Sequence, residues 1–238
     1  MTAPRPFIVA IDGPAGAGKS SASRLLAGRL GFALVDTGAI YRTVALAANR
    51  QGVAFDDDAR LGLLMPTVAI RFAPAAQPGG PQQVFLGGED VSAAIRTPPM
   101  SLGASAVSAR PVVRAGLLDL QRRLATAPEN RGAVLEGRDI GTVVFPDADL
   151  KVFLTASEDC RARRRHVELQ GKGDASSYEQ VLEEQRRRDR NDSQRELAPL
   201  RPAADARLFD TSGIPLDEVV ELLAREVEAT LAARGVAR

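Results

Sequence analysis

The chain is poor in cysteine and histidine. Its 238 residues include one cysteine, Cys160, and one histidine, His166. A single cysteine excludes an internal disulfide and a cysteine-rich zinc cluster, which is typical of proteins in a reducing compartment. His166 has no carboxylate partner nearby in the sequence, and Cys160 has no activating pattern beyond neighbouring arginines. We therefore expect neither side chain to act in catalysis.

Long apolar runs and an excess of charge are also missing. No apolar run approaches the roughly 20 residues that a membrane-spanning helix needs. The first predicted strand begins at Phe7, which predicts that the chain has no signal peptide. The net charge is +1, so there is no general attraction to nucleic acid or to membranes. We expect a cytoplasmic protein that binds neither, with the 45% of hydrophobic residues forming an ordinary core.

Lysine is scarce as well, since it occurs only at positions 19, 151 and 172. One of these three lies in a phosphate-binding pattern, GxxxxGK(S/T), which the segment Gly13–Ser20 matches at every fixed position. Glycines let successive backbone N–H groups turn towards phosphate oxygens, and the helix predicted over 18–30 adds its positive end. In this pattern Lys19 reaches the β- and γ-phosphates and the Ser20 hydroxyl ligates Mg²⁺. The segment therefore predicts a nucleoside triphosphate site, and its lysine is the expected catalytic cation.

Short apolar runs alternate with helical patterns along most of the chain. This alternation predicts an α/β fold with a doubly wound, five-stranded parallel sheet, which binds ligands at the carboxyl ends of its strands. The five predicted strands are 7–11, 32–35, 132–136, 150–154 and 206–210. Predicted helices cover 39–50, 99–108, a stretch after 111, 157–170, 178–195 and a final stretch from 215.

One region breaks this alternation. The runs 68–72 and 83–87 alternate apolar and polar residues with no helix between them, and 91–95 is compatible with a third short strand. We interpret 67–97 as a small β-rich insertion in a single domain that covers residues 1–238.

Three charged clusters lie where ligands are expected. The segment 36–42 follows the second predicted strand, although a capped helix start with a surface arginine explains it equally well. The segment 136–142 follows the third strand, and its charged residues beside glycine favour a functional role. Arg188, Asp192 and Arg195 are spaced to share one helical face, where a solvated salt-bridge ladder is the alternative.

Several arginines around a phosphate-binding loop indicate that two polyanions are brought together. Phosphoryl transfer to an acceptor phosphate needs no general base, because the acceptor oxygen is already ionised. It needs positive charge that aligns the anions and stabilises the transition state. The absence of a convincing histidine or glutamate base therefore favours a phosphate acceptor over a hydroxyl acceptor.

Five motifs in order carry a resemblance to a known family. They are IDGPAGAGKS at 11–20, DTGAIYR at 36–42, EDVSAAIRT at 89–97, EGRDIGTVVFPDA at 136–148 and RDRNDSQR at 188–195. In these motifs, and along essentially its whole length, the chain closely resembles the bacterial cytidylate kinases, P-loop nucleoside-monophosphate kinases related to adenylate kinase. The resemblance implies that ATP with Mg²⁺ phosphorylates CMP or dCMP, and that a β-rich insertion lies beside the monophosphate site.

The resemblance also implies residue roles. Catalytic charges would come from Lys19, Arg138 and Arg188, and the metal ligand from Ser20. The ATP site would comprise Gly13, Pro14, Ala15, Gly16, Ala17, Gly18, Lys19, Ser20 and Ser21, with lid arginines Arg161, Arg164 and Arg165 in a lid-like region over 157–190. The acceptor phosphate would be bound by Thr37, Arg42, Arg138 and Arg188, cytosine by Ser105, Arg114 and Asp139, and the sugar by Asp192 and Arg195.

The assignment of the base has a physical basis. Cytosine carries an exocyclic amine where uracil carries a carbonyl oxygen. A fixed carboxylate such as Asp139, with a Ser105 oxygen, accepts a hydrogen bond from the amine and leaves the carbonyl unmatched. Because each unmatched buried polar group costs about 1–3 kcal/mol, a clear preference for CMP over UMP is expected.

Two alternatives remain at this stage. One is a P-loop kinase for another small acceptor, such as UMP, AMP or a shikimate-like alcohol. The other is a nucleotide-dependent switch without catalysis, although the chain has no Asn-Lys-x-Asp guanine-binding motif. We also expect a monomer, because no long apolar stripe is left after the core has been assigned.

Overall fold

The computed structural model describes residues 5–77, 80–171 and 173–235. Contacts group the chain into two compact units. The first unit comprises Met1–Val35 and Leu124–Arg238, and the second comprises Asp36–Arg123. The second unit extends well beyond 67–97 on both sides. A single domain with an insertion at 67–97 stays a prediction about domain organisation, and the two units are described separately below.

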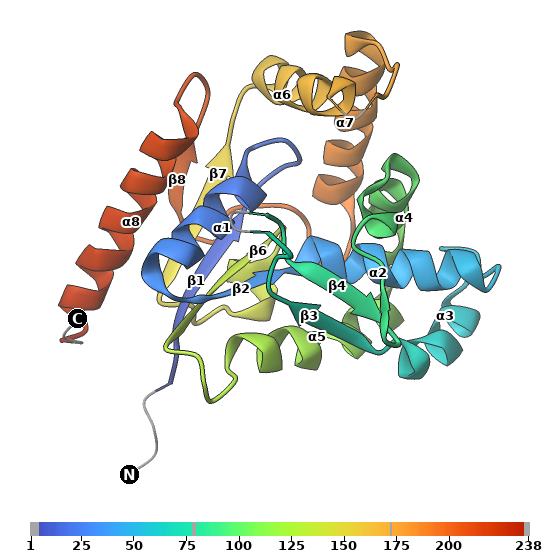
Figure 1. Cartoon of the computed structure of the whole chain (residues 1–238), viewed down its shortest axis with the longest axis horizontal. Coiled ribbons are helices and arrows are strands. Elements are labelled where there is room, and N and C mark those ends of the chain that lie inside the picture. The colour runs from blue at the N-terminus through green and yellow to red at the C-terminus, as the bar shows by residue number, and fades with distance from the viewer. Residues whose placement is uncertain (1–4, 78–79, 172, 236–238) are drawn as a thin grey trace. The chain divides into compact units, whose positions relative to one another are not determined.

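The first unit is built on a five-stranded parallel sheet, which confirms the predicted fold class (Figure 1). Its strands are β1 (Phe7–Asp12), β2 (Ala33–Asp36), β6 (Gly132–Gly137), β7 (Leu150–Thr155) and β8 (Arg207–Asp210). They lie in the order β2-β6-β1-β7-β8. From β1 the chain first adds strands on one side of it, β2 and β6, and then on the other side, β7 and β8. The direction in which strands are added therefore reverses at β1. The loop after β1 therefore starts at the switch point of the sheet, where ligands bind.

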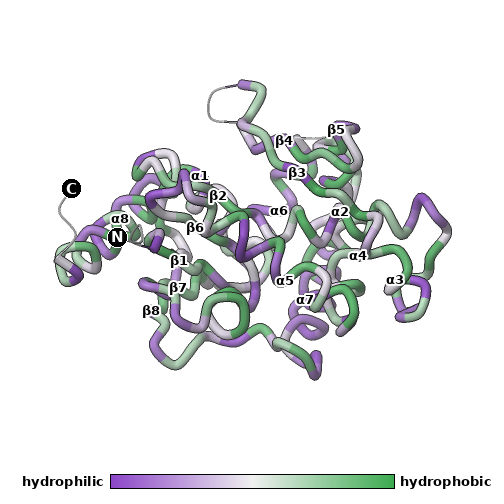
Figure 2. The backbone as a smooth tube through the Cα atoms, turned by 90° about the horizontal axis from the view of Figure 1, so that it is seen from below, coloured by the Kyte–Doolittle hydropathy of each residue, from purple (hydrophilic) through white to green (hydrophobic). Residues whose placement is uncertain are grey.

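β1 is central and buried at every position. A parallel strand that is covered on both faces needs a continuous apolar run, which the sequence FIVAI supplies. Helices α1 (Lys19–Leu30) and α8 (Leu216–Ala233) pack together, with Leu26 and Leu223 fully buried in the same core (Figure 1). The α8 tube shows both hydrophobic and hydrophilic segments along its length (Figure 2), as expected for a helix with one face on a core.

Two further helices, α6 (Glu158–Gln170) and α7 (Tyr178–Gln194), follow β7 and pack against each other (Figure 1). Ser157 caps α6, and Ser177 with Gln180 forms a reciprocal capping box at the start of α7. The predicted helix over 178–195 is one residue too long. Arg195 has extended backbone dihedrals after the last helical residue, so it does not share a helical face with Arg188 and Asp192.

The second unit combines helices with a small antiparallel sheet. Its helices are α2 (Thr37–Arg50), α3 (Asp58–Leu64), α4 (Pro98–Ser108) and α5 (Pro111–Ala125), with 3₁₀ turns η1 (Met65–Thr67) and η2 (Ala94–Arg96). The sheet has the strand order β3 (Ile70–Ala73), β4 (Gln83–Leu86) and β5 (Glu89–Asp90). The two strands predicted at 68–72 and 83–87 are therefore present.

A strand over 91–95 is wrong. The third strand is β5, and the chain turns immediately after it because the Asp90 carboxylate accepts the Ser92 N–H at 2.8 Å. The Ile95 N–H then donates to the Val91 carbonyl at 3.0 Å, which closes a helical turn. Val91 and Ile95 are both fully buried, so their spacing matches one side of a turn.

Across the described ranges, no helix is both long enough and apolar enough to span a membrane.

Candidate active site

The loop between β1 and α1 is shaped by glycines. Gly13, Gly16 and Gly18 have φ values of 147°, 76° and 88°, a region that other residues rarely adopt. A Cβ on Gly13 would lie 1.9 Å from the Leu154 carbonyl oxygen of β7, so no side chain fits there. Gly18 is the residue before α1, and the helix begins at Lys19. The loop thus leads directly into a helix N-terminus, which is a ready anion site.

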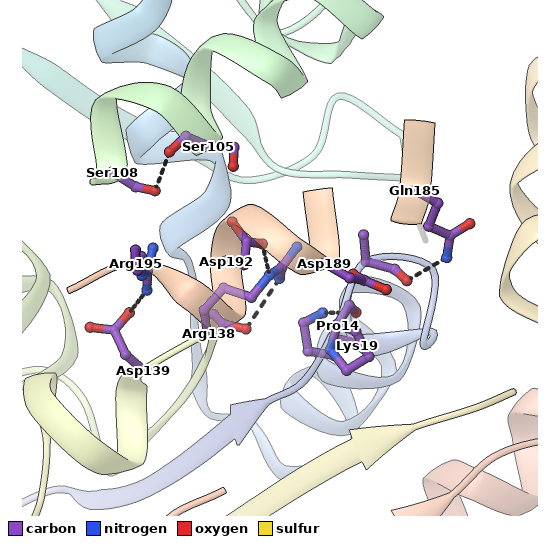
Figure 3. A network of polar contacts seen from close by, with 12 residues as sticks. Pro14, Lys19, Ser105, Ser108, Arg138, Asp139, Gln185, Asp189, Asp192 and Arg195 are labelled. Atoms are coloured by element: carbon purple, nitrogen blue, oxygen red, sulfur yellow. Dashed lines mark hydrogen bonds and ion pairs between the residues drawn. The ribbon is translucent and has the colours of Figure 1, made fainter. Parts of the chain in front are cut away.

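Lys19 is folded back over this loop. Its Nζ donates to the Pro14 carbonyl oxygen at 2.7 Å, and the residue is 6% exposed (Figure 3). Burial lowers the pKa of Lys19 well below its ordinary value, and the positive charges of Arg138 and Arg188 act in the same direction. Glu136 and Asp12 oppose this shift. A bound polyphosphate would favour the charged lysine, so the site is electrostatically suited to an anion.

Ser20 contacts a carboxylate from the neighbouring strand. Its hydroxyl donates to Glu136 Oε2 at 2.7 Å, and Glu136 lies near the end of β6, which pairs with β1. Hard oxygen donors of this kind suit Mg²⁺, which takes one or two protein ligands and completes its shell with phosphate and water. Within the described ranges no cluster of three or more His, Cys, Asp or Glu side chains is arranged for a metal. Ser20 and Glu136 therefore fit a magnesium ion that arrives with a nucleotide.

Asp12 joins the end of β1 to the turn that follows Asp139. Its two carboxylate oxygens accept the N–H groups of Ile140 and Gly141, each at 2.8 Å. The residue is 4% exposed, and burial raises its pKa to about 6, against the opposing effect of these two hydrogen bonds. The turn itself is one turn of π-helix over Ile140–Val144, of a type that often marks functional sites.

Two ion pairs organise the charged residues after β6. Arg138 Nε lies 2.9 Å from Asp192 Oδ2, and Arg195 lies 3.4 Å from Asp139 Oδ1 (Figure 3). Arg195 also donates to the Ala198 carbonyl oxygen at 2.6 Å. The first unit therefore brings together the predicted residues from 136–142 and from 188–195. Asp192 pairs with Arg138 from the segment after β6, whereas a solvated salt-bridge ladder would pair it only with arginines of its own helix.

The predicted lid arginines make different contacts. Arg161 is 5% exposed and donates to the carbonyl oxygens of Ala156 and Ala15, both at 2.9 Å. Arg164 donates to the hydroxyl and the carbonyl oxygen of Thr211, at 3.0 and 2.6 Å. Arg165 pairs with Glu168 at 2.9 Å. Contact between these arginines and ATP phosphates stays a prediction.

The second unit holds the remaining predicted acceptor residues. Thr37 is buried as the first residue of α2, and Arg42 pairs with Asp36 at 3.1 Å. In another part of this unit, the Ser108 hydroxyl and Arg114 both contact the end of α4. Ser108 Oγ donates to the Ser105 carbonyl oxygen at 2.9 Å, and Arg114 donates to the Ser108 carbonyl oxygen at 3.2 Å.

Comparison with known proteins decides the family. The family model for cytidylate kinase matches residues 9–229. The chain belongs to the cytidylate kinase family. A cytidylate kinase of Geobacter sulfurreducens is 52% identical over 217 residues, covering 91% of each chain. One of Syntrophotalea carbinolica is 50% identical over 223 residues, covering 94% of this chain and 92% of its own. This membership identifies the protein as an ATP-dependent kinase and confirms the resemblance carried by the five motifs.

A distant structural relative supports the fold alone. An uncharacterised protein from Eubacterium ventriosum aligns with a TM-score of 0.50 at 11% identity, covering 93% of this chain and 98% of its own. At this level of identity, the likeness carries no information about substrate.

The structure adds three residues to the candidate site that sequence reasoning did not single out. Glu136 belongs to the charged segment 136–142, but the sequence alone assigns it no function. Its position at the end of a predicted buried strand could have suggested one. Asp12 lies in the phosphate-loop motif, where nothing indicates that it holds a turn 128 residues away. Gln185 donates to the Ala15 carbonyl oxygen at 2.8 Å, and no motif marks it.

Proposed function

We propose that this kinase transfers the γ-phosphoryl group of ATP to CMP or dCMP, giving ADP and CDP or dCDP. The observation that carries the proposal is the electrostatic grouping of Lys19 with Arg138 and Arg188 at the phosphate-binding loop. Three cations around one loop are suited to two repelling phosphate groups. The cytidylate kinase names of relatives near 50% identity point to the acceptor base.

The donor would lie in the glycine-rich loop. Backbone N–H groups of Gly13–Ser20 and the start of α1 would cradle its phosphates, and Lys19 would turn from Pro14 towards the γ-phosphate. Ser20 and Glu136 would hold Mg²⁺, directly or through water. When bound, this ion neutralises phosphate charge and helps to align the transferred group.

The acceptor phosphate would be held by arginines. Arg138 and Arg188 from the first unit, with Thr37 and Arg42 from the second, supply donors and positive charge for it. Because this phosphate is already ionised, the reaction needs no residue to remove a proton. These side chains would orient the attacking oxygen and stabilise the charge that spreads over the transferred group.

Specificity would come from the base and the sugar. We propose Asp139, Ser105 and Arg114 as cytosine-binding residues, and Asp192 with Arg195 as sugar-binding residues. Asp192 would then hold Arg138 and contact the substrate at the same time. Such shared use would align the phosphate-binding arginine with the bound nucleoside.

We further propose a cytoplasmic monomer that does not bind nucleic acid. A near-neutral net charge and a single cysteine support this proposal. In the same plan, 67–97 serves the monophosphate site, and Arg161, Arg164 and Arg165 within 157–190 close over ATP. Light scattering at several protein concentrations tests the oligomeric state.

An acceptor panel tests the function directly. Purified protein is given ATP and Mg²⁺ with CMP, dCMP, UMP, AMP or shikimate in turn, and formation of ADP is followed. We expect CMP and dCMP to give the largest initial rates. Rapid turnover of another acceptor without formation of CDP would overturn the proposal. Nucleotide binding without any phosphotransfer would indicate a switch instead.

A further inference from the structure

The tip of the phosphate-binding loop is attached to the α6–α7 pair. The Ala15 carbonyl oxygen accepts a hydrogen bond from Gln185 Nε2 at 2.8 Å (Figure 3). It accepts another from Arg161 at 2.9 Å. The next residue, Gly16, lies so close that a Cβ would be 2.8 Å from the same Gln185 nitrogen. The loop backbone and α7 are therefore in direct contact.

Gln185 contributes to this contact through its donor only. The residue is 6% exposed, and its Oε1 is buried without a hydrogen-bond partner among the residues that the structure describes. An unsatisfied buried acceptor destabilises the fold, so packing alone would favour an apolar side chain here. A glutamine at this position is explained if its amide N–H group is needed to hold the Ala15 carbonyl oxygen of the loop.

Arg161 strengthens the same attachment. Besides its bond to Ala15, it forms an ion pair with Asp189 at 2.6 Å, and both side chains are largely buried. Asp189 lies one helical turn after Gln185 on α7. The P-loop tip, the start of α6 and the middle of α7 are thus joined by one connected set of hydrogen bonds, which has few alternative arrangements.

The face of α7 that carries this attachment also carries acceptor residues. Gln185, Arg188, Asp189 and Asp192 are spaced by three, four and seven residues, so they lie along one side of the helix. Asp192 pairs with Arg138, and Arg188 acts on the charge of Lys19. About 10 Å of helix, at 1.5 Å per residue, separates the loop contact from Asp192.

We propose that Gln185 is a positioning residue that passes the state of the phosphate-binding loop to Arg188 and Asp192 through α7. Donor phosphates must fix the loop backbone when they bind its N–H groups. Through the Ala15 carbonyl, that ordering would fix α7 and so set the acceptor residues before the acceptor arrives. The identity of the acceptor in this inference rests on the proposed function, whereas the link itself does not.

Hydrogen exchange with the donor alone tests the link. A magnesium-bound, non-hydrolysable ATP analogue is added to the wild type and to Gln185→Met, which keeps the side-chain length but removes the donor. In the wild type we expect slower exchange in the P-loop, in α1 and across α7. In Gln185→Met we expect the P-loop and α1 to respond as before, while protection of α7 falls by about tenfold, the effect of one buried hydrogen bond.

The matched control is Gln170→Met, which makes the same change at the exposed end of α6 and should behave as wild type. Retained protection of α7 in Gln185→Met would overturn the inference, because the response of α7 would then not pass through Gln185. Absence of α7 protection in the wild type would also overturn it. If Gln185→Met does not fold, Gln185→Asn withdraws the amide by one methylene and gives the same test.

Kinetics separate positioning from simple destabilisation. Loss of stability would lower kcat by reducing the folded fraction and leave KM unchanged. Loss of positioning should raise KM for CMP by about tenfold in a fully folded enzyme, with a smaller change in KM for ATP. An unchanged KM for CMP would count against the inference. Failure to phosphorylate CMP at all would overturn the proposed function, while the exchange result would still decide the link.

Discussion

The two units hold their predicted site residues in different ways. In the first unit, Lys19, Asp139 and Asp192 are nearly buried, and charged groups from distant segments are paired with one another. In the second unit, Arg42, Ser105 and Arg114 are partly exposed, and the hydrogen bonds that Ser105 and Arg114 make with Ser108 lie at the end of a single helix. The first arrangement is fixed by many partners at once, while the second depends on local geometry. We therefore expect substitutions of the ion-paired residues in the first unit to affect both stability and chemistry, and substitutions in the second unit to affect recognition alone.

The largest effect is expected for Lys19→Met. Loss of the cation at the transferred phosphate should lower kcat by about 10³-fold or more. Stability should not fall, because a buried ammonium whose pKa is depressed carries a burial penalty that the variant removes. Initial rates and thermal unfolding measure the two outcomes. A large loss of stability would show that Lys19 is also a structural residue.

Asp139→Ala should come next. We expect kcat/KM for CMP to fall by about 100-fold and the preference over UMP to disappear, because the amine loses its acceptor. Stability should fall too, since Arg195 would keep a buried charge without this partner. Arg188→Ala is the matched comparison and should weaken every acceptor alike. A retained preference for CMP in Asp139→Ala would exclude Asp139 as the base-reading residue.

Asp12 gives the first unit a dependence on pH. Its folded pKa of about 6 lies above its ordinary value of 3.8, so the folded state binds a proton more tightly than the unfolded state. The ionised carboxylate therefore destabilises the fold by about 3 kcal/mol above pH 6, and this penalty disappears as the pH falls towards 4.

Urea unfolding of Asp12→Asn at several pH values tests this sign. In the wild type, protonation of Asp12 should increase the free energy of unfolding as the pH falls from 6 to 4. The variant should lack this increase, whatever its own absolute stability. The difference between variant and wild type should change with pH only in that window. A constant difference across it would show that Asp12 does not titrate as proposed.

The smallest effect is expected in the second unit, for Ser105→Ala. Removing one hydroxyl that is proposed to read cytosine should lower the CMP-to-UMP ratio of kcat/KM by about five- to tenfold. The free energy of unfolding should change little, because Ser105 is partly exposed and its carbonyl oxygen, which accepts the Ser108 hydrogen bond, is kept in the variant. Strong destabilisation would remove the contrast between the units.

Local patterns in the sequence were sufficient for the sheet and the phosphate-binding loop. The five strands and the helix after Gly18 follow from apolar runs, glycines and caps that act over a few residues. The end of α7 before Arg195 could not be predicted from the sequence, because no glycine or proline directly follows the last helical residue. The loop after α7 folds back on the helix end: the Leu200 N–H donates to the Asp192 carbonyl oxygen at 2.7 Å, and Ala198 has a positive φ of 50°.

Pairings between distant segments were out of reach for a different reason. The Ser20–Glu136 and Arg138–Asp192 contacts join residues that are 116 and 54 positions apart, and no local rule connects them. Family motifs supplied the candidate site residues, but they could not say which side chains pair. Gln185 belongs to no motif at all, because its contact is with a backbone carbonyl that any sequence presents.

The position of Gly13 against Leu154 has a consequence for the gene. Any encoded side chain at position 13 would push the start of the phosphate-binding loop away from β7, so the sheet itself excludes every alternative residue. In a saturation library at this codon, only synonymous changes should survive selection for activity. Position 15, by contrast, contributes a carbonyl to the α7 contact, and its small side chain should tolerate some replacement. Positions 13 and 15 of one motif are thus expected to differ sharply in the substitutions that they tolerate.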